Sequence, residues 1–201
     1  SAVPVTPVVT LANDSGIDGG DLLTNNGALT VIGIEAGALV EYSTDGGATW
    51  GATFTAAEGS NTVAVRQTDA AGNVSDSGSL TFTLDTTAPA IPGVALTNDS
   101  GSNNSDLITN DGALTLTGIE AGATVEYSLD GGATWSTTYS PIDGLNNVDV
   151  RQTDLAGNPS SVGNLSFTLD TTITSPSFSL NNDSGPSAVD NITSDGLVNV
   201  T

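Results

Sequence analysis

The chain has 201 residues. Two are Arg, none are Lys, His or Cys, and 23 are Asp or Glu, so its net charge is −21. This charge excludes nucleic acid as a partner, because almost nothing is available to neutralise phosphates. The lack of His and Cys excludes disulfides and metal sites with nitrogen or sulfur ligands, which leaves the oxygen ligands that calcium prefers. No stretch of about 20 apolar residues occurs, and we expect no membrane insertion by this segment.

One sequence repeat occurs twice along the chain, and a third copy begins at Leu180. Landmark residues recur 85 positions later: Tyr42 as Tyr127, Trp50 as Trp135, Arg66 as Arg151 and Asp85 as Asp170. The third copy begins with LNNDSG and runs to Thr201. We therefore predict a first repeat at 1–86, a second at 87–171 and the truncated start of a third at 172–201. A fixed period makes the repeat the functional unit, as in arrays that act through length and stiffness.

Within each copy, apolar residues alternate with polar ones at a period of two, which predicts strands. In the first copy the runs predict strands at 6–12, 21–24, 28–34, 38–44, 48–55, 61–69 and 78–85. The short run at 21–24 is accepted because an odd number of strands places the two chain ends at opposite poles, as a linear array requires. The predicted fold is all-β, with tandem immunoglobulin-like β-sandwich domains of about seven strands each.

The two copies meet at the short segment LDTTAPAIP, in which two prolines keep the backbone extended. Because this linker is short, the facing poles of the two repeats must nearly touch. The strand parity gathers the loop 14–21, Glu35 and Asp85 at the C-terminal pole of the first copy. The loop TDLAGN of the second copy lies at the facing pole, which brings Asp85 towards Asp154 and Asn158.

Crowded carboxylates at this junction predict a calcium site. Two carboxylates about 4 Å apart repel by roughly 4 kcal/mol at an effective dielectric near 20, unless a cation bridges them. Calcium accepts about six to eight oxygens from carboxylates, amides and backbone carbonyls. Candidates at the junction are Asp85, Asp154, Asn158, Asp14, Asp21 and Glu35, and the matching positions of the other copy are Asp170, Asp69, Asn73, Asp99, Asp106 and Glu120. The alternative is that Asp and Asn only cap turns and keep loops soluble, which for any one acid is the better interpretation.

Four motifs mark the repeats: NDSG, SxDGGATW, TDxAGN and LDTTAP. Together they resemble the bacterial Ig-like repeats of giant type I-secreted, RTX-type adhesins and biofilm-associated proteins, over both full copies and residues 180–201. The resemblance implies tandem sandwiches with calcium at their junctions, in a stalk on the bacterial cell surface. It implies as ligands Asp69, Asp85, Asp154 and Asp170, and from the NDSG motifs Asp14, Asp99 and Asp183. Ser1 aligns with Thr86, so no linker Asp precedes the first copy, and we expect a weakened site around Asp69.

The motif SxDGGxTW also fits the Asp-box, a hairpin familiar from sialidase propellers. A sialidase-like site needs a cluster of Arg residues, whereas Arg66 and Arg151 occupy equivalent places in separate copies. Propeller blades also repeat at shorter intervals. We therefore interpret the motif as a hairpin in which Asp ties backbone amides and Trp covers the core edge, and we expect each Arg to pair across the sheet with Glu41 or Glu126.

The sequence lacks the catalytic residues that other enzymatic functions need, and we therefore expect that the chain is not an enzyme. Without His or Cys no nucleophilic triad is available. Paired carboxylates that cut glycosides would need an aromatic-lined cleft, and the nine aromatic residues fall mostly on core positions. One hypothesis is an extracellular extender on the bacterial cell surface, a monomer whose partners are neighbouring repeats and calcium ions. The second hypothesis is a carbohydrate- or protein-binding adhesive module.

Overall fold

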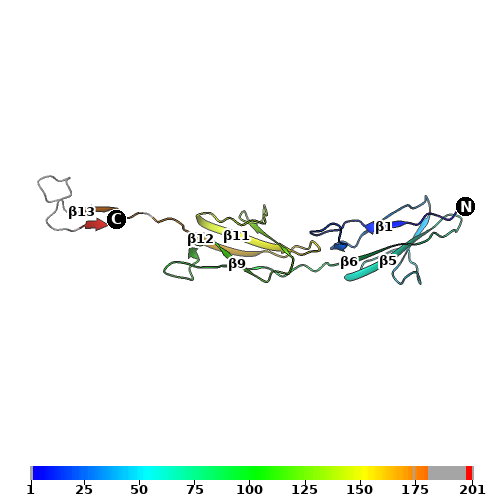
Figure 1. Cartoon of the computed structure of the whole chain (residues 1–201), viewed down its shortest axis with the longest axis horizontal. Coiled ribbons are helices and arrows are strands. Elements are labelled where there is room, and N and C mark those ends of the chain that lie inside the picture. The colour runs from blue at the N-terminus through cyan, green and yellow to red at the C-terminus, as the bar shows by residue number, and fades with distance from the viewer. Residues whose placement is uncertain (1, 174, 181–197, 201) are drawn as a thin grey trace. The chain divides into compact units, whose positions relative to one another are not determined.

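The computed structural model describes residues 2–173, 175–180 and 198–200, and all regular elements among them are strands (Figure 1). Two compact units are present, Ser1–Leu169 and Asp170–Thr201. The first unit contains all of repeat 1 and repeat 2 up to Leu169, where the last strand of repeat 2 ends. The second contains an antiparallel pair, β13 (Phe178–Leu180) with β14 (Val198–Val200).

Both repeats have the same six strands in the same order. Those of repeat 1 are β1 (Val8–Leu11), β2 (Leu23–Thr24), β3 (Leu29–Ile32), β4 (Leu39–Ser43), β5 (Gly59–Thr68) and β6 (Gly78–Leu84). Those of repeat 2 are β7 (Gly93–Leu96), β8 (Ile108–Thr109), β9 (Leu114–Thr117), β10 (Thr124–Ser128), β11 (Gly144–Thr153) and β12 (Gly163–Leu169).

Two sheets face each other in each repeat. In repeat 1, β1 pairs with β3, and a four-stranded sheet has the order β2-β6-β5-β4. All pairs are antiparallel except that of β2 with β6, which is parallel. Repeat 2 has the same arrangement, with β7 and β9 in one sheet and β8, β12, β11 and β10 in the other. The predicted all-β fold of tandem β-sandwich domains is confirmed.

The core lies between the two sheets, because alternate residues of each strand face inwards. In repeat 1 it consists of Val9, Val63 and Val65, against which Leu29, Val31, Val40, Tyr42, Phe54 and Leu80 pack. The core of repeat 2 is built on Val148, Val150, Phe167 and Leu169. The exposed outward positions of β5 and β6 carry Ser and Thr, so the period of two separates core from surface there, whereas outward positions of other strands also hold exposed apolar residues such as Val8, Ile32 and Leu39.

The short strand β2 shows where the chain enters and leaves repeat 1. It pairs with the end of β6, and just beyond it the Asp85 amide donates to the Thr24 carbonyl at 2.9 Å. At the start of β6, Gly78 lies so close to Pro7 that a Cβ would stand 2.1 Å from the Pro7 carbonyl oxygen. The chain therefore enters at an N-terminal pole near Pro7 and leaves at a C-terminal pole near Thr24, as the strand at 21–24 predicted.

The strand predicted at 48–55 is wrong. Only Gly51 joins the sheet, through two hydrogen bonds of 2.8 and 2.9 Å to Tyr42. A little further on, the Asn61 side chain bonds to both backbone groups of Ala57, at 2.9 and 2.7 Å. A side chain thus satisfies the backbone that a neighbouring strand would otherwise have to pair. Each repeat has six strands and an isolated bridge at this place, where seven strands were expected.

Candidate functional site at the repeat junction

The C-terminal pole of repeat 1 is organised by the hydroxyl of Thr24, which is fully buried. Thr24 Oγ1 donates to the Asn13 carbonyl at 2.9 Å and accepts from the Asn26 amide at 3.0 Å. Ser15 Oγ lies 3.1 Å from this hydroxyl and accepts from the Asn25 amide at 2.8 Å. The loops on either side of β2 are thereby held together, with Ser15 and Asn25 side by side at the pole.

The loop before β2 is closed by two carboxylates. Asp14 Oδ2 accepts from the Leu22 amide at 3.0 Å, and Asp21 Oδ1 accepts from the Leu23 amide at 2.9 Å. Leu22 has a φ of 62°, in the left-handed region that residues other than glycine rarely enter. Repeat 2 has the same turn at Leu107, with a φ of 59°. Asp14 and Asp21 therefore serve first to hold an unusual turn.

The loop of repeat 2 at residues 153–158 is closed on itself. Asp154 Oδ1 accepts from the Asn158 amide at 2.8 Å, and its Oδ2 accepts from the Asn158 side-chain amide at 2.9 Å. Gly157 has a φ of 95°, which lets the chain turn tightly between them. Asp154 is only 2% exposed and Ala156 only 1%, whereas Leu155 between them is exposed, so the loop buries Asp154 and Ala156 and turns Leu155 outwards.

Three hydrogen bonds cross from repeat 1 to this loop, and we call them the repeat junction. They join Ser15 Oγ to the Ala156 carbonyl (2.6 Å), Asn25 Nδ2 to the Gly157 carbonyl (3.0 Å) and Asn158 Nδ2 to the Asp85 carbonyl (2.8 Å). The sequence placed Asp85 near Asn158, and the structure joins the two. The bond runs to the backbone carbonyl of Asp85, whereas its carboxylate was the predicted ligand.

Gly16 brings the two backbones into direct contact beside these bonds. Its φ is 98°, and a Cβ at this position would lie 2.0 Å from the Leu155 carbonyl oxygen. Both the conformation and the close approach require glycine. The Gly of the NDSG motif is therefore explained by contact with the following repeat.

Glu35 does not lie at the C-terminal pole, and that part of the prediction is wrong. Its amide donates to Gln67 Oε1 at 2.8 Å, and Gln67 Nε2 donates to the carbonyls of Val5 (2.7 Å) and Gly33 (2.8 Å) at the N-terminal pole. The reason is that β3 runs antiparallel to β1, back towards the N-terminal pole, so the loop after β3 reaches the opposite end. Its equivalent Glu120 belongs to the N-terminal pole of repeat 2, on the junction side.

The other predicted ligands bond to backbone amides of their own loops. The pairs are Asp69 with Asn73 (2.9 Å), Asp85 with Thr87 (2.9 Å), Asp99 with Leu107 (3.1 Å), Asp106 with Ile108 (3.1 Å) and Asp170 with Thr172 (3.1 Å). Asp183 lies outside the described residues. For each of these acids taken singly, the bonds are those of the turn-capping alternative.

Two features of the acids go beyond turn capping. Asp154 is a buried carboxylate, and the salt bridges found in the described residues are those of Arg66 and Arg151, neither of which reaches it. Asp14 Oδ1 and its equivalent Asp99 Oδ1 are buried oxygens for which the described residues supply no hydrogen-bond partner. Buried anionic oxygens are costly unless donors or a cation compensate them.

The acids do not form a metal centre by side chains alone. Across the described ranges, no three acidic side chains converge into a group that could hold an ion. A cation at the junction would therefore also need backbone carbonyls, amide oxygens or water, which calcium accepts readily. The backbone carbonyls of Asp85, Ala156 and Gly157 lie at the junction and offer oxygen ligands of the kind that such an ion accepts.

The junction residues that sequence analysis missed are Ser15, Gly16 and Asn25. A signal for them was present, because each recurs 85 positions later as Ser100, Gly101 and Asn110. Ser, Gly and Asn are also common turn residues, so recurrence alone did not separate a contact between repeats from a conserved loop shape within each repeat.

The DGG hairpins form as predicted. Asp45 Oδ2 accepts from the Thr49 hydroxyl at 2.6 Å and Oδ1 accepts from the Thr49 amide at 2.9 Å. Together with a bond from Ser43, these lower the pKa of Asp45 from 3.8 to about 2. The Thr134 hydroxyl and amide lower the pKa of Asp130 in the same way, also to about 2. The Asp of this motif thus ties the hairpin together.

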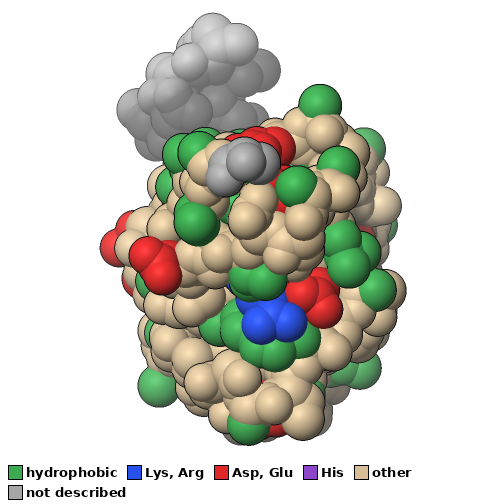
Figure 2. Space-filling view, turned by 90° about the vertical axis from the view of Figure 1, so that its right-hand side faces the viewer, with side chains coloured by type: hydrophobic (Ala, Val, Ile, Leu, Met, Phe, Trp, Pro, Cys, Tyr) green, Lys and Arg blue, Asp and Glu red, His purple; other side chains and the backbone are tan. Residues whose placement is uncertain are grey.

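Trp50 was expected to cover the core edge, but it lies beneath Arg66, whose guanidinium carbon is 4.1 Å from the ring centroid. Arg66 Nε donates to Glu41 Oε2 at 3.0 Å, as their pairing across the sheet predicted. Figure 2 shows a basic side chain set in this way among hydrophobic ones, with an acidic side chain beside it. The same arrangement in repeat 2 consists of Arg151, Trp135 and Glu126. Each Arg is already paired, so the two form no cluster of the sialidase type.

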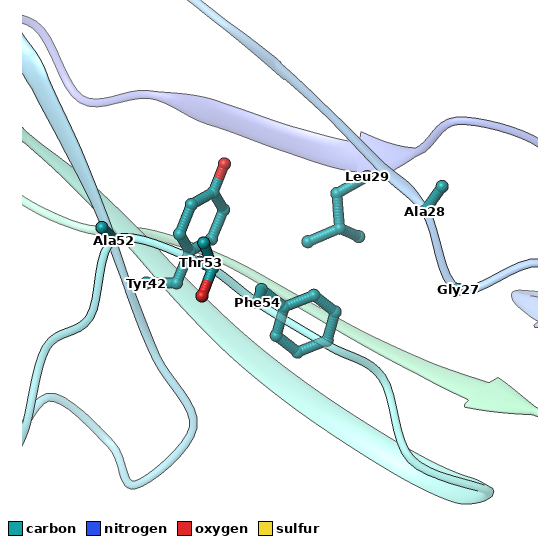
Figure 3. A pocket seen from close by; sticks show the side chains of 7 residues that line it. All are labelled: Gly27, Ala28, Leu29, Tyr42, Ala52, Thr53 and Phe54. Carbon is teal, nitrogen blue, oxygen red and sulfur yellow. The ribbon is translucent and has the colours of Figure 1, made fainter.

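A cavity of about 300 Å³ opens in repeat 1 where the strand at 48–55 was expected. Figure 3 shows the side chains of Leu29, Tyr42 and Phe54 around it. The full lining consists of Gly27, Ala28, Leu29, Tyr42, Ala52, Thr53 and Phe54. None of these residues is acidic or basic, so the cavity offers no acid–base chemistry and no metal ligands of the carboxylate kind.

Comparison with known domain families decides what kind of sandwich this is. The bacterial Ig-like domain profile matches residues 2–86 and again residues 87–171. The chain belongs to the bacterial Ig-like domain family. These Ig-like domains are of a non-catalytic kind, no enzyme domain was found beside them, and such domains are common in surface and secreted proteins. In the part of the chain that the structure describes, no helix has the length and apolar character needed to cross a membrane.

Among solved structures, the Ig-like chain is similar to the fibronectin(III)-like modules of Clostridium thermocellum CbhA. The identity is 13%, the match covers 84% of this chain and 90% of that chain, and the TM-score is 0.41. A likeness at this level carries no argument about function. No curated protein matches the chain.

Proposed function

We propose that the chain is an extender segment of a large bacterial cell-surface adhesin, in which Ig-like domains are joined pole to pole and calcium stiffens the junctions. The observation that carries this proposal is the repeat junction, where three hydrogen bonds join one domain directly to the next. The motif resemblance to RTX-type adhesins supports the extracellular location and type I secretion. Such a segment acts through reach and stiffness, and it needs no catalytic pocket.

The junction resists bending through direct contacts. Each of its three hydrogen bonds contributes about 0.5–1.5 kcal/mol net, and the short linker keeps the two poles at a high effective concentration. Gly16 and Leu155 bring backbone against backbone, so the domains cannot approach more closely or slide without a clash. A hinge built this way favours one arrangement over many.

Calcium supplies the positive charge that this junction lacks. The buried carboxylate of Asp154 and the buried Oδ1 of Asp14 are the observations that favour an ion. Because no three acidic side chains of the described residues converge, the ion would take Asp154 or Asp14 together with backbone carbonyls such as that of Asp85, amide oxygens and water. At free calcium about 100 times the dissociation constant, one site stabilises the folded form by about 2.7 kcal/mol.

The alternative of an adhesive binding module has less support from the structure. Its best candidate is the cavity lined by Tyr42 and Phe54, but these rings belong to the core. The Tyr42 and Phe54 ring centroids lie 6.4 Å apart, and those of Phe54 and Phe82 lie 6.3 Å apart. Aromatic rings engaged with one another in this way leave little surface for stacking on a sugar.

The test is small-angle scattering and thermal unfolding of the full chain in chelator and in about 10 mM calcium, above the 10⁻⁴–10⁻³ M affinities of extracellular calcium modules. We expect calcium to raise the melting temperature and to extend the particle. Asp154→Asn should remove most of this response, because it removes the buried charge. Asp69→Asn is the matched control in the equivalent loop of repeat 1 and should leave the response at the junction intact.

Two outcomes would contradict different parts of the proposal. A scattering curve and melting temperature that calcium leaves unchanged would exclude the role of the ion. Scattering from freely jointed domains in both conditions would exclude a stiff extender altogether.

A further inference from the structure

We propose that the C-terminal pole of repeat 2 is a second docking seat, built for the D-x-A-G-N loop of a further Ig-like domain that follows in tandem. Its parts are Ser100, Gly101 and Asn110, which occupy the positions of Ser15, Gly16 and Asn25. The inference rests on the proposed function, since it extends the extender by another junction. The chain has two such poles, and the one of repeat 1 is engaged by the loop of repeat 2.

The two poles have the same internal construction. Thr109 is 2% exposed and donates to the Asn98 carbonyl at 2.8 Å, as Thr24 donates to Asn13 at 2.9 Å. Ser100 Oγ accepts from the Asn110 amide at 2.8 Å, the same distance as that between Ser15 and the Asn25 amide. The seat in repeat 2 is therefore already folded.

The two poles differ in their outward hydrogen bonds. At the engaged pole, Ser15 Oγ and Asn25 Nδ2 donate to carbonyls of the next repeat. At the pole of repeat 2, Ser100 Oγ instead donates to Asn110 Oδ1 at 2.9 Å. The two side chains that would bind a loop are thus bonded to each other. This bond satisfies the half-buried Ser100 hydroxyl in the unengaged form of the seat.

Gly101 keeps the shape of the seat although no described residue lies against it. Its φ is 104°, close to the 98° of Gly16. A Cβ on Gly16 would meet the Leu155 carbonyl oxygen at 2.0 Å, whereas a Cβ on Gly101 would meet no heavy atom of the described residues within 4 Å. The described residues therefore leave open, at this pole, the space that the Leu155 carbonyl fills at the engaged one.

The known occupant defines what the seat recognises. At the engaged pole two successive carbonyls, those of Ala156 and Gly157, accept the two bonds, and Ala156 is 1% exposed. A larger side chain than Ala has no room there, and Gly157 has a φ of 95° that favours glycine. The partner is therefore a loop of the Asp-x-Ala-Gly-Asn type. The sequence continues past Asp170 into a third copy that opens at Leu180, so we assign the seat to the next domain in tandem.

The experiment uses the full chain lengthened by a duplicate of residues 86–170 inserted after Asp170, which completes a third repeat. The chain has no Cys, so pairs of introduced Cys carry spin labels without competition. Thr44→Cys with Leu129→Cys spans the known junction, and Leu129→Cys with the same change in the inserted repeat spans the new one. Both sites are exposed hairpin positions. We expect the two distance distributions to have the same mean and the same narrow width.

Variants in the lengthened chain separate docking from mere tethering. Ser100→Ala with Asn110→Ala should broaden only the distribution across the new junction, and Ser15→Ala with Asn25→Ala should broaden only the known one. Asn103→Ala, in the exposed part of the same loop, should change neither. A narrow distribution at the known junction with a broad one at the new junction would overturn the second seat. Broad distributions at both would instead overturn the proposed function.

A second copy of the chain is the competing occupant. In the unmodified two-repeat chain carrying Leu129→Cys alone, we expect no intermolecular distance at high protein concentration. A defined intermolecular distance that disappears in Ser100→Ala with Asn110→Ala would show that a second copy of the chain occupies the seat. That result would overturn the tandem assignment.

Discussion

The side-chain amide of Asn158 donates to the backbone carbonyl of Asp85 at 2.8 Å, although 73 residues separate the two. The same amide donates to Asp154 Oδ2 at 2.9 Å. One side chain therefore closes the loop of the second domain and fastens the linker that leaves the first. The geometry of the linker and the geometry of the loop depend on each other through this amide.

Replacing Asn158 with Ala should destabilise the chain by more than the same change in repeat 1. Asn158→Ala removes the bond to Asp85 as well as the bond to Asp154, and each hydrogen bond contributes about 1 kcal/mol. Asn73→Ala is the matched control, because Asn73 Nδ2 makes the equivalent bond to Asp69 at 2.8 Å. Urea unfolding should show a loss about 1 kcal/mol larger for Asn158→Ala. Equal losses would contradict a role for the bond to Asp85.

Gly16→Ala should open the junction, whereas Gly101→Ala should not. Both glycines have a positive φ, 98° and 104°, so both variants carry a backbone strain of roughly 1–2 kcal/mol. Only the Ala at position 16 also meets the Leu155 carbonyl, 2.0 Å from its Cβ. Small-angle scattering should therefore show a more flexible particle for Gly16→Ala alone. The same change in both scattering curves would mean that the backbone contact does not hold the domains.

The loss of folding stability at acidic pH should depend on Asp45 and Asp130. Both have a folded-state pKa of about 2, below the ordinary 3.8, because the hydroxyls and amides of Thr49 and Thr134 bond to the ionised form. Their contribution is complete above about pH 4 and is lost as the pH falls towards 2. The double variant Asp45→Asn with Asp130→Asn should show a flatter fall of melting temperature in this range. A fall as steep as that of the original chain would argue against the hairpin bonds.

Tyr139→Phe should stabilise repeat 2. The Tyr139 hydroxyl is buried and has no hydrogen-bond partner in the described residues, and burial followed by the nearby Tyr127 raises its pKa to about 12. An unsatisfied buried hydroxyl costs about 1–3 kcal/mol, so its removal should raise the free energy of unfolding by about 1 kcal/mol. Repeat 1 has Phe54 at this position, and Phe54→Tyr should have the opposite effect. Denaturant unfolding of both variants checks the prediction, which a loss of stability in Tyr139→Phe would contradict.

The sequence correctly predicted the strands in which apolar and polar residues alternate. Residues on β5 and β6 alternate strictly, and the two-residue strand β2 was also found, although the odd strand count used to accept it is wrong because each repeat has six strands. The prediction failed at 48–55, where only Gly51 pairs with the sheet, and just after it the Asn61 side chain bonds the backbone of Ala57 in place of a strand partner. A pattern of apolar residues does not reveal a side chain that replaces a strand.

The place of the junction was predicted, but the hydrogen bonds across it were not. Acidic residues drew attention to Asp85 and Asp154, yet the bonds between the domains are made by Ser15, Asn25 and Asn158. These residues recur in both copies and bond differently in each, as Ser100 shows. In repeat 1 their partners lie in the neighbouring repeat, and that information is not contained in a repeat read by itself.

Gln67 has a consequence for how such chains change over time. Fully buried, it holds the incoming segment and the turn after β3 through main-chain atoms only, namely the carbonyls of Val5 and Gly33 and the amide of Glu35. Gln152 does the same in repeat 2, where Ala90 stands in place of Val5. Since this grip uses main-chain atoms only, the gripped residue of the connector can differ, as Val5 and Ala90 do, while the path of the connector stays the same. The buried prolines Pro7 and Pro92 recur in both connectors, so divergence is expected at the exposed connector positions and not at these prolines.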